Sequence, residues 1–321
     1  MRIVSFLPSA TEMIYALDLG DQLVGVTHEC DYPETAKIKA VVVRSAVAME
    51  GLTPQEIDAA VSRAIKEGKS IYTVDEVLIK SLAPDLILTQ DLCQVCAPFG
   101  NEVGRLLTHL KNPPKIVWLT PNCLLDIFEN LKQIGEATGK EAAAARVVLG
   151  LQERINAVVE RTRTLSSRPR VFCMEWLSPP YCAGHWVGEM VSLAGGEDRL
   201  ARTGQDSVRI KWEEIIAYAP EVLILSPCGF HLPRVLEQAH LLTDYPNWEE
   251  LPAVKNARVF AVDASSYFAR PGPRVVDGVE LLAHLIHPDH FSWDGPEEAY
   301  SCLSIEALKT LQAKGKIEYK R

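Results

Sequence analysis

Thiol, imidazole and carboxylate side chains follow two apolar runs in the first half of the chain. His28, Glu29 and Cys30 come directly after one run, and Cys93 and Cys96 follow another with a Cys-x-x-Cys spacing. Because the carboxyl ends of parallel strands meet at one edge of a sheet, these side chains are expected to converge there. Thiolates and imidazole are preferred ligands of zinc, and an iron–sulfur cluster accepts several of them. We therefore predict a metal site at His28, Cys30, Cys93 and Cys96.

The same cysteines have two other interpretations. A Cys-x-x-Cys pair can act as a redox dithiol when its surroundings lower the pKa of one thiol. Free cysteines are also among the most buried residue types, so these three can be small core residues. Their spacing matches no zinc-ribbon pattern, and all three interpretations stay open at this point.

A second group of side chains, in the second half of the chain, can form the walls of a ligand site. His185 stands beside Trp186, and a histidine next to a tryptophan can cap a metal or a planar ligand. The alternative is a loop histidine that only makes hydrogen bonds. Cys228 and His231 follow an apolar run. The predicted ligand-binding residues of this half are Trp176, His185, Trp186, Cys228, Tyr267, Phe268 and Arg270.

Two arginines flank a Pro-Gly-Pro segment before a predicted helix that starts near Val275. Either Arg270 or Arg274 can hold a carboxylate or an amide carbonyl of a ligand. Arginine is almost never buried without a partner, so a salt bridge within the protein is the alternative. Asp277 and Glu280 are then the expected partners.

The elements that position these side chains include an internal repeat. Residues 75–90 and 212–226 each contain a short amphipathic pattern, an Ala-Pro pair that ends a helix, an acidic residue and an apolar run of strand length. Strand and helix patterns alternate in both halves, which favours parallel sheets. The predicted strands are residues 2–7, 23–28, 86–90 and 115–120, then 170–176, 222–226 and 258–262.

One long helix is predicted between the two halves. Thr138 and Glu141 have the spacing of a capping box, and an apolar face continues to Arg163. About 25 helical residues span roughly 38 Å, enough for a rigid rod between two domains. We therefore predict an α/β fold of two Rossmann-like lobes with mainly parallel sheets, one long interlobe helix and a ligand cleft between the lobes. The expected parts are 1–136, the helix 137–165, 166–290, and a C-terminal extension 291–321. From Ser304 this extension is expected to begin with a cap and a short amphipathic helix and to end in a basic, solvated tail.

Composition excludes several classes of protein. A chain of 321 residues favours two domains, and its net charge of −9 argues against nucleic-acid binding. No apolar run approaches the roughly 20 residues of a membrane span, so membrane insertion is not expected. The chain enters an apolar run at Ile3 without a basic leader, which predicts a cytoplasmic protein with reduced cysteines. Removal of a leader would instead place it in the periplasm or elsewhere outside the cytoplasm.

A series of motifs resembles one known family. The series comprises Ser5-Phe-Leu-Pro8-Ser-Ala-Thr-Glu12, Asp31-Tyr32-Pro33, Pro84-Asp85-Leu86, Pro179-Pro180, Ala194-Gly195-Gly196, Trp212-Glu213 and Arg270-Pro-Gly-Pro-Arg274. In this order the chain is similar to the helical-backbone (class III) periplasmic-type substrate-binding proteins of cobalamin, haem and iron-siderophore importers, and most of all to the cobalamin-binding branch. The resemblance implies a binding protein and not an enzyme. It predicts a corrinoid such as cobalamin, or a related metal chelate, in the interlobe cleft, with Pro8 and Ser9 among the ligand contacts.

The chain departs from this family at two kinds of functional position. Where the cobalamin carriers have aromatic residues facing the corrin, it has Glu29 and Gln90, so the ligand contacts expected there have a different chemistry. The carriers also dock on their transporter through one surface glutamate on each lobe. Glu213 matches one of these, whereas Val77, beside Glu76, stands at the other, which weakens the expectation of a permease partner. The alternative hypothesis is a cytoplasmic metal-binding or thiol-redox protein, an enzyme included, that uses the predicted metal site.

Overall fold

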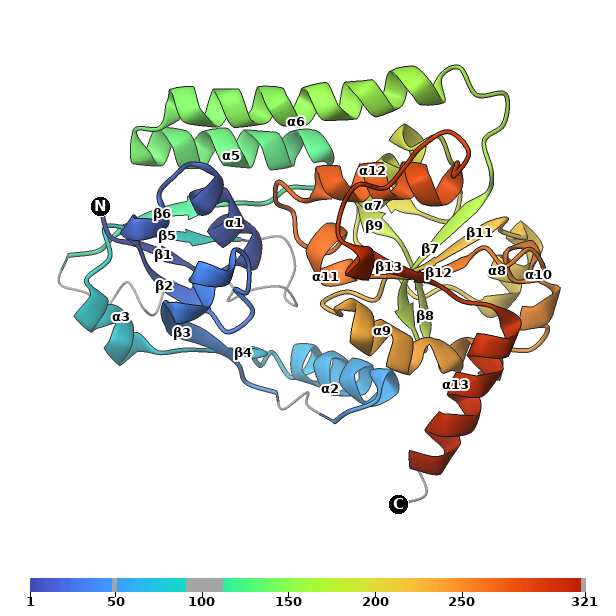
Figure 1. Cartoon of the computed structure of the whole chain (residues 1–321). Coiled ribbons are helices and arrows are strands. Elements are labelled where there is room, and N and C mark those ends of the chain that lie inside the picture. The colour runs from blue at the N-terminus through green and yellow to red at the C-terminus, as the bar shows by residue number, and fades with distance from the viewer. Residues whose placement is uncertain (48–50, 91–111, 319–321) are drawn as a thin grey trace. The chain divides into compact units, whose positions relative to one another are not determined.

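The computed structural model describes residues 1–47, 51–90 and 112–318. The chain forms two compact units, Met1–Leu151 (unit 1) and Gln152–Arg321 (unit 2), and each contains its own sheet with helices around it (Figure 1). The α/β class with mainly parallel sheets is confirmed. The cleft between lobes stays a prediction. Cys93 and Cys96 lie outside the described residues.

Unit 1 contains a six-stranded sheet in the order β4-β3-β2-β1-β5-β6. Its strands are β1 (Ile3–Ser5), β2 (Leu23–Thr27), β3 (Ala40–Ser45), β4 (Tyr72–Val74), β5 (Leu86–Thr89) and β6 (Lys115–Trp118). Only the pairing of β3 with β4 is antiparallel. The central strands β1 and β5 are buried along their length, which explains why they are continuous apolar runs. The sequence predicted four of the strands but not β3 and β4.

The helices of unit 1 begin at recognisable local signals. α1 starts at a proline, whose missing N–H is not needed in a first turn, and α2 starts with a capping box between Thr53 and Glu56. α5 buries Ile127, Leu131 and Ile134, which lie on one face. The helical elements are α1 (Pro8–Ala16), η1 (Gly20–Gln22), η2 (Glu34–Ile38), α2 (Pro54–Lys66), α3 (Glu76–Leu82) and α5 (Leu124–Thr138).

The long helix α6 (Glu141–Thr162) runs from unit 1 into unit 2, as the sequence predicts. Its 22 residues correspond to about 33 Å. The expected capping box at Thr138 is wrong. Thr138 is the last residue of α5, and its hydroxyl donates a hydrogen bond to the Ile134 carbonyl at 2.7 Å. Gly139, at φ 69°, has the left-handed conformation that ends a helix, and the chain restarts at Glu141.

Unit 2 contains a five-stranded sheet in the order β13-β12-β11-β7-β8. The strands are β7 (Val171–Leu177), β8 (Pro180–Cys182), β11 (Val222–Leu225), β12 (Val259–Val262) and β13 (Tyr300–Cys302). The three central strands are parallel, and β8 and β13 pair antiparallel at the two edges. A separate parallel pair is formed by β9 (Gly184–His185) and β10 (Arg202–Thr203).

The helices of unit 2 cover this sheet. α12 is amphipathic: its partly exposed polar residues Asp277, Glu280 and His284 share one face, and its other residues are buried. The helical elements are α7 (Val187–Leu193), α8 (Trp212–Tyr218), α9 (Leu232–Gln238), η3 (Ala239–Asp244), η4 (Trp248–Glu250), α10 (Pro252–Lys255), α11 (Ala264–Tyr267), α12 (Val275–Ile286), η5 (Glu297–Ala299) and α13 (Ile305–Glu318).

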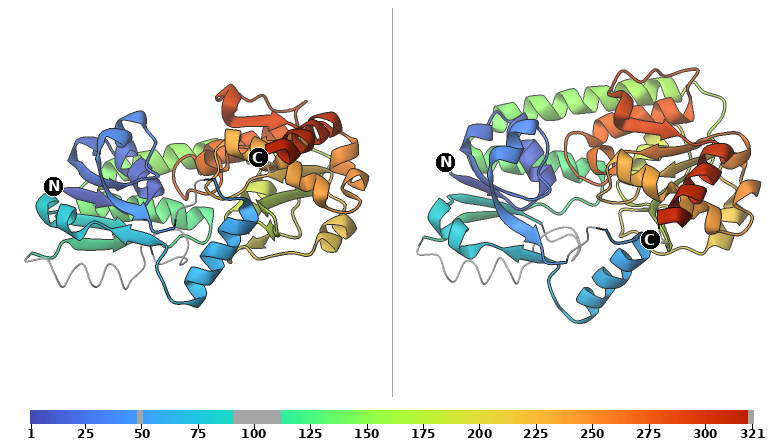
Figure 2. Two further views of the ribbon diagram at one scale, coloured as in Figure 1. Left: turned by 90° about the horizontal axis from the view of Figure 1, so that it is seen from below. Right: turned by 60° about the horizontal axis from the view of Figure 1, so that its bottom comes forward.

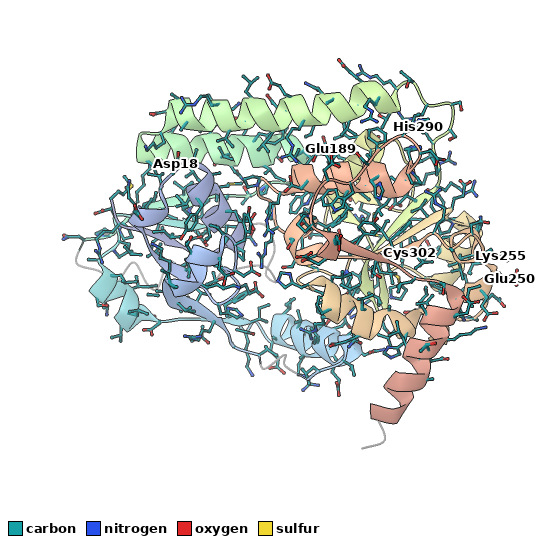
Figure 3. All side chains as sticks on the ribbon, in the orientation of Figure 1. Asp18, Glu189, Glu250, Lys255, His290 and Cys302 are labelled. Atoms are coloured by element: carbon teal, nitrogen blue, oxygen red, sulfur yellow. The ribbon has the colours of Figure 1, made fainter. Side chains whose placement is uncertain are left out.

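The C-terminal extension is part of unit 2. β13, which carries Cys302 (labelled in Figure 3), pairs with β12, and α13 packs on η3 at the outside of the unit (Figure 2). Leu308 is fully buried, and Lys309 Nζ lies 2.8 Å from Glu249 Oε1. The expected capped amphipathic helix is present as α13, and one apolar face of its described part is covered.

The internal repeat forms the same local structure twice. α3 followed by β5, and α8 followed by β11, have equal lengths and equal spacing. Ala83 and Ala219 end the two helices in the left-handed conformation, at φ 43° and 52°. In both copies an arginine just before the neighbouring strand donates through Nε to a carbonyl at the end of the helix: Arg2 to Leu82, the last residue of α3, and Arg170 to Ala219, the residue after α8, at 3.0 Å.

Candidate functional site

The carboxyl edge of the unit 1 sheet gathers four predicted ligand-binding residues. β1 lies between β2 and β5, so the connections leave it toward opposite sides, and ligands of parallel α/β sheets bind at such a switch point. Pro8 and Ser9 begin α1 directly after this strand, and Ser9 is buried. Glu29 follows β2 and is exposed, and Gln90 follows β5.

Gln90 has an unsatisfied polar atom at this edge. Only 3% of the residue is exposed, and Nε2 has no hydrogen-bond partner among the described residues. A buried donor without an acceptor costs about 1–3 kcal/mol, and native proteins contain few of them. An acceptor supplied by a ligand would satisfy this amide.

The side chains of His28 and Cys30 lie in different surroundings. His28 is exposed, with Nδ1 3.3 Å from the Val43 carbonyl oxygen. Cys30 is buried, and its Sγ lies 3.1 Å from Thr11 Oγ1 and 3.4 Å from Thr27 Oγ1. In the described part of the chain no group of three His, Cys, Asp or Glu side chains could hold a metal ion. The other two predicted ligands lie outside the described residues, so the four-residue metal site has no support here.

Ser226 occupies in unit 2 the position that Gln90 occupies in unit 1. Each is the first residue after the strand of its copy, β11 or β5. Ser226 is 2% exposed, and its hydroxyl also has no partner in the part of the chain that the structure describes. The two copies therefore place a buried polar atom without a partner at equivalent points of their carboxyl edges.

The predicted pair His185 and Trp186 makes contacts within unit 2. Trp186 is buried, and its Nε1 donates to the Phe268 carbonyl oxygen at 2.8 Å. His185 Nε2 lies 3.1 Å from a carboxylate oxygen of Asp206, without the alignment of a hydrogen bond. Burial lowers the pKa of His185, and the Asp206 carboxylate opposes this shift. Each side chain thus contacts a distant segment of unit 2, Trp186 at Phe268 and His185 at Asp206. Their role as ligand walls stays a prediction.

The other predicted wall residues lie in three separate segments of unit 2. Trp176 packs edge-on against Phe230, with ring centroids 5.2 Å apart. Cys228 is exposed, and its backbone N–H donates to the Glu175 carbonyl oxygen at 3.1 Å. The remaining three, Tyr267, Phe268 and Arg270, are buried at or just after the end of α11. Their contact with a ligand is untested.

The expected partners of Arg270 and Arg274 bind a different arginine. Arg154, on α6, donates from Nε to Glu280 Oε1 at 2.9 Å, and from one Nη to Glu280 Oε2 and Asp277 Oδ1, each at 2.5 Å. The hydrogen bond to Glu280 is the main reason why the pKa of Arg154 is raised. The sequence did not reveal Arg154 as a partner, because α6, distant in sequence, lies alongside α12 in unit 2. The positive charge of Arg274 also opposes the rise that burial causes in the pKa of Asp277, so a pairing of Arg270 or Arg274 with these acids stays a prediction.

A histidine–carboxylate pair is the main feature of this edge that sequence reasoning missed. His231 begins α9 after β11, and Asp263 begins α11 after the neighbouring strand β12. Nδ1 of His231 lies 3.0 and 3.1 Å from the two Asp263 oxygens. Asp263 also caps α11 by accepting from Ser266 N at 2.9 Å. A signal was present, because both residues directly follow the ends of neighbouring parallel strands.

Two half-buried acids anchor the segment that carries β9 and β10. Glu175, in β7, accepts from the Gly184 N–H at 3.1 Å, and burial raises the pKa of its carboxyl to about 7. Asp198 accepts from the N–H groups of Cys173, Leu200 and Ala201 at 3.0–3.1 Å, and burial raises its pKa to about 6. Both groups therefore lose protons more reluctantly than exposed carboxyls do.

Comparison with known proteins gives a consistent set of similarities. A family described as periplasmic binding protein matches residues 3–265. The chain is 28% identical over 299 residues to an uncharacterized ABC transporter substrate-binding lipoprotein of Bacillus subtilis, covering 90% of this chain and 81% of the relative. It is 26% identical over 286 residues to the vitamin B12-binding protein of Vibrio cholerae, covering 88% and 87%. Its fold matches the periplasmic heme-binding protein RhuT of Roseiflexus, at a TM-score of 0.68 and 20% identity, covering 90% and 98%.

These similarities contradict the predicted cytoplasmic location. The matching family is described as periplasmic, and the Bacillus relative is a lipoprotein. The prediction was wrong because it used the first residues of the chain, which do not decide where the protein acts. None of the matches supports a zinc or iron–sulfur site. No described helix is long and apolar enough to cross a membrane.

Proposed function

The chain belongs to the periplasmic binding protein family, and we propose that it binds a corrinoid, or a closely related metal chelate, for an ABC importer. Members of this family bind solutes and are not enzymes, as the sequence predicted. Relatives that bind vitamin B12 and a structural neighbour that binds haem support a flat metal chelate as the ligand class.

One kind of observation carries the proposal: Gln90 in unit 1 and Ser226 in unit 2 each bury a polar atom that has no partner among the described residues. Both side chains are buried at the carboxyl edge of a parallel sheet, and neither has a partner for the polar atom concerned among the described residues. Such edges are where α/β proteins bind ligands. A hydrogen-bonding group of a ligand at either edge would satisfy the polar atom there.

The chemistry of unit 1 favours a corrinoid over haem. The rim of a corrin carries carboxamides, which offer both acceptors and donors. Gln90 Nε2 can donate to an amide carbonyl, and the exposed carboxylate of Glu29 can accept from an amide N–H. Haem carries carboxylates instead, which Glu29 would repel.

We further propose that the protein acts outside the cytoplasm and meets a membrane permease through unit 2. Glu213 is exposed on α8, as a docking glutamate must be. At the equivalent position of α3 stands Val77, which is 78% exposed. An exposed apolar side chain at that position is consistent with a contact surface in unit 1 that lacks the charge.

The test is a calorimetric titration of the full chain with cobalamin, with haem as the comparison ligand. We expect one-to-one binding of cobalamin at micromolar affinity or tighter. The Gln90→Leu and Ser226→Ala variants should each bind about tenfold more weakly, because each removes one buried hydrogen bond to the ligand. Gln133→Leu, at an exposed position of α5, is the matched control and should bind like the parent protein.

Each outcome decides between ligands. Binding of haem but not cobalamin would keep the family assignment and reject the corrinoid. Binding of neither compound would refute the proposal. Full affinity in the Gln90→Leu and Ser226→Ala variants would show that the ligand lies elsewhere.

A further inference from the structure

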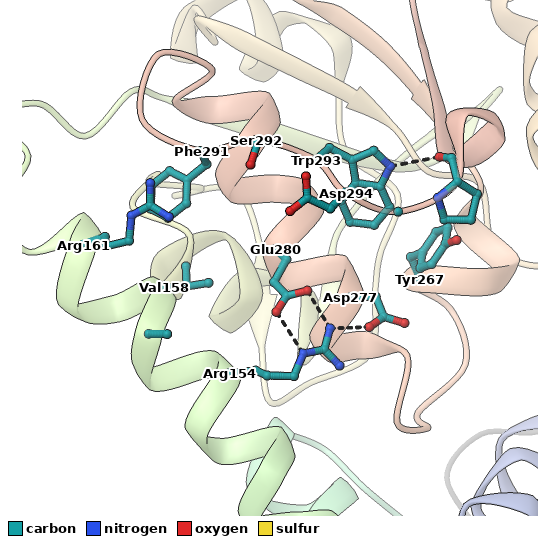
Figure 4. A pocket seen from close by; sticks show the side chains of 13 residues that line it. Arg154, Val158, Arg161, Tyr267, Asp277, Glu280, Phe291, Ser292, Trp293 and Asp294 are labelled. Carbon is teal, nitrogen blue, oxygen red and sulfur yellow. Dashed lines mark hydrogen bonds and ion pairs between the residues drawn. The ribbon is translucent and has the colours of Figure 1, made fainter.

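A pocket of about 520 Å³ lies in unit 2. It is lined by the second half of α6, by α12, by Tyr267 and by the segment 291–296 (Figure 4). That segment follows the last residue of the family match, so the family assigns nothing to it. The volume is in the range of small-molecule sites, which is about 300–1,000 Å³.

Two cations of the chain already occupy part of this pocket. Arg154 is held between Glu280 and Asp277, as Figure 4 shows. Arg161 lies over the ring of Phe291, with its guanidinium carbon 4.2 Å from the ring centroid, and donates to the His290 carbonyl. The pocket thus stabilises guanidinium groups in two ways, by carboxylates and by an aromatic face.

The indole of Trp293, a second aromatic group described in the pocket, is held in place by its own turn. Trp293 Nε1 donates to the Pro296 carbonyl oxygen at 2.9 Å, which fixes the indole within its own turn. A Cβ at Gly295 would lie 2.2 Å from this ring, so the turn requires a glycine there. The rings of Tyr267 and Trp293 are nearly perpendicular, at a centroid distance of 5.9 Å and an angle of 85°. The indole therefore needs little ordering to receive a ligand.

Asp294 follows this tryptophan and supplies an uncompensated charge. Its side chain is exposed at the pocket and forms no ion pair with any residue that the structure describes. With Asp277 and Glu280 the lining has three carboxylates, against the two guanidinium groups of Arg154 and Arg161. The lining therefore has one negative charge in excess, which favours a cation.

We propose that this pocket binds an organic cation, an alkylammonium or alkylguanidinium group, at the ring of Trp293 and the carboxylate of Asp294. The indole attracts a cation within about 6 Å of its face, and the carboxylate adds a direct ion pair. The cation can belong to a free small molecule or to a lysine or arginine side chain of a partner protein. Trp293 and Asp294 are not among the residues predicted to contact the ligand of the sheet edges, whereas Tyr267, one of those residues, also lines this pocket.

The test is a titration of the full chain with n-butylguanidinium, with n-butylurea as a neutral probe of nearly the same shape. We expect about millimolar affinity for the cation and at least about fivefold weaker binding of the urea. Asp294→Asn should weaken cation binding about fivefold, and Trp293→Leu at least as much. The matched control is Glu160→Gln, which removes one negative charge from an exposed position of α6 outside the pocket and should leave cation binding unchanged.

Equal binding of the two probes, or equal effects of Asp294→Asn and Glu160→Gln, would overturn the proposal. Asp294→Asn is isosteric and exposed, so it tests the charge even if Trp293→Leu disturbs the turn. A capped tripeptide with a central arginine distinguishes the two sources of the cation. Binding as tight as that of butylguanidinium supports a protein side chain, whereas binding of butylguanidinium alone supports a free solute.

Discussion

The two units have the same local structure up to the third residue of their first strands, β1 in unit 1 and β7 in unit 2. Beyond that point they differ. Backbone pairing places Ser5 opposite Leu88 in unit 1 and Cys173 opposite Ile224 in unit 2, which are equivalent pairs in the repeat. In unit 1 the chain leaves the sheet and enters α1 at Pro8. In unit 2 the strand β7 continues to Leu177 and pairs with β8.

This difference changes the chemistry of the two carboxyl edges. Two residues after Ser5 stands the buried apolar Leu7, whereas Glu175 stands at the equivalent place of unit 2. The extended β7 also supports the loop that bears Cys228, through its backbone hydrogen bond to Glu175. The shared scaffold is thus defined by the backbone, and the divergence lies in the residues that leave it, where binding properties can change without loss of the fold.

The largest difference that we expect between the two edges is a dependence of stability on pH that arises at Glu175. Its pKa is about 7 in the folded protein, above the ordinary 4.5, so the folded state binds this proton more tightly than the unfolded state. The resulting stabilisation is complete below pH 4.5 and is lost as the pH rises through 7. Glu175→Gln cannot ionise, and we expect it to raise the free energy of unfolding at pH 8 by about 2 kcal/mol, allowing for partial exposure.

Urea unfolding at pH 4.5 and pH 8 measures this effect. The gain should be present at pH 8 and largely absent at pH 4.5, where Glu175 is neutral. Burial also raises the pKa of Asp198, so part of the dependence of stability on pH should remain in the Glu175→Gln variant. The exposed Glu160→Gln serves as control. An equal change at both pH values would mean that ionisation of Glu175 is not the cause.

A smaller effect should appear at the two unsatisfied polar atoms. Without ligand, Gln90→Leu and Ser226→Ala each remove a buried polar group that has no partner in the described residues. We expect each to raise the free energy of unfolding of the ligand-free protein by about 1 kcal/mol, in contrast to their loss of ligand affinity. Thermal unfolding without cobalamin measures the expected gain in stability, and unfolding with cobalamin measures the expected loss of stabilisation by the ligand.

The two variants also sharpen the comparison of the units. Similar gains in the free energy of unfolding would show that burying the polar atom destabilises the protein equally at the two equivalent positions. Destabilisation of the ligand-free protein by either variant would show that the residue is satisfied within the folded chain, and would remove that residue from the proposed site.

The sequence predicted those parts of the fold that depend on local signals. The Ala-Pro pairs and the buried runs at Leu86–Thr89 and Val222–Leu225 identified both copies of the repeat with nearly correct boundaries. The strand β3, a run of valines, had a readable composition and was overlooked. β4 has three partly exposed residues, and its antiparallel place beside β3 depends on pairing rather than on local pattern.

The candidate site was less predictable because its contacts are non-local. The pairs His231–Asp263 and Arg154–Glu280 join residues that are far apart in sequence, and their side chains meet only through strand order and helix packing. The orientation of Cys30 toward Thr11 depends on how α1 covers β2, which no spacing rule supplies. Residue types at strand ends could be foreseen, but not their partners.

The smallest predicted effect tests whether the repeat is equivalent in energy as well as in geometry. Ala83 and Ala219 both have a left-handed conformation, which costs an alanine about 1–2 kcal/mol and costs a glycine almost nothing. Glycine also increases the entropy of the unfolded chain, which offsets part of the gain. We therefore expect Ala83→Gly and Ala219→Gly each to stabilise the protein by about 0.5 kcal/mol in urea unfolding. An arginine binds a carbonyl at the end of the helix in both copies, so the two gains in the free energy of unfolding should be equal. A gain at one site alone would show that the hydrogen bonds of Arg2 and Arg170 hold the two helix ends with different strength.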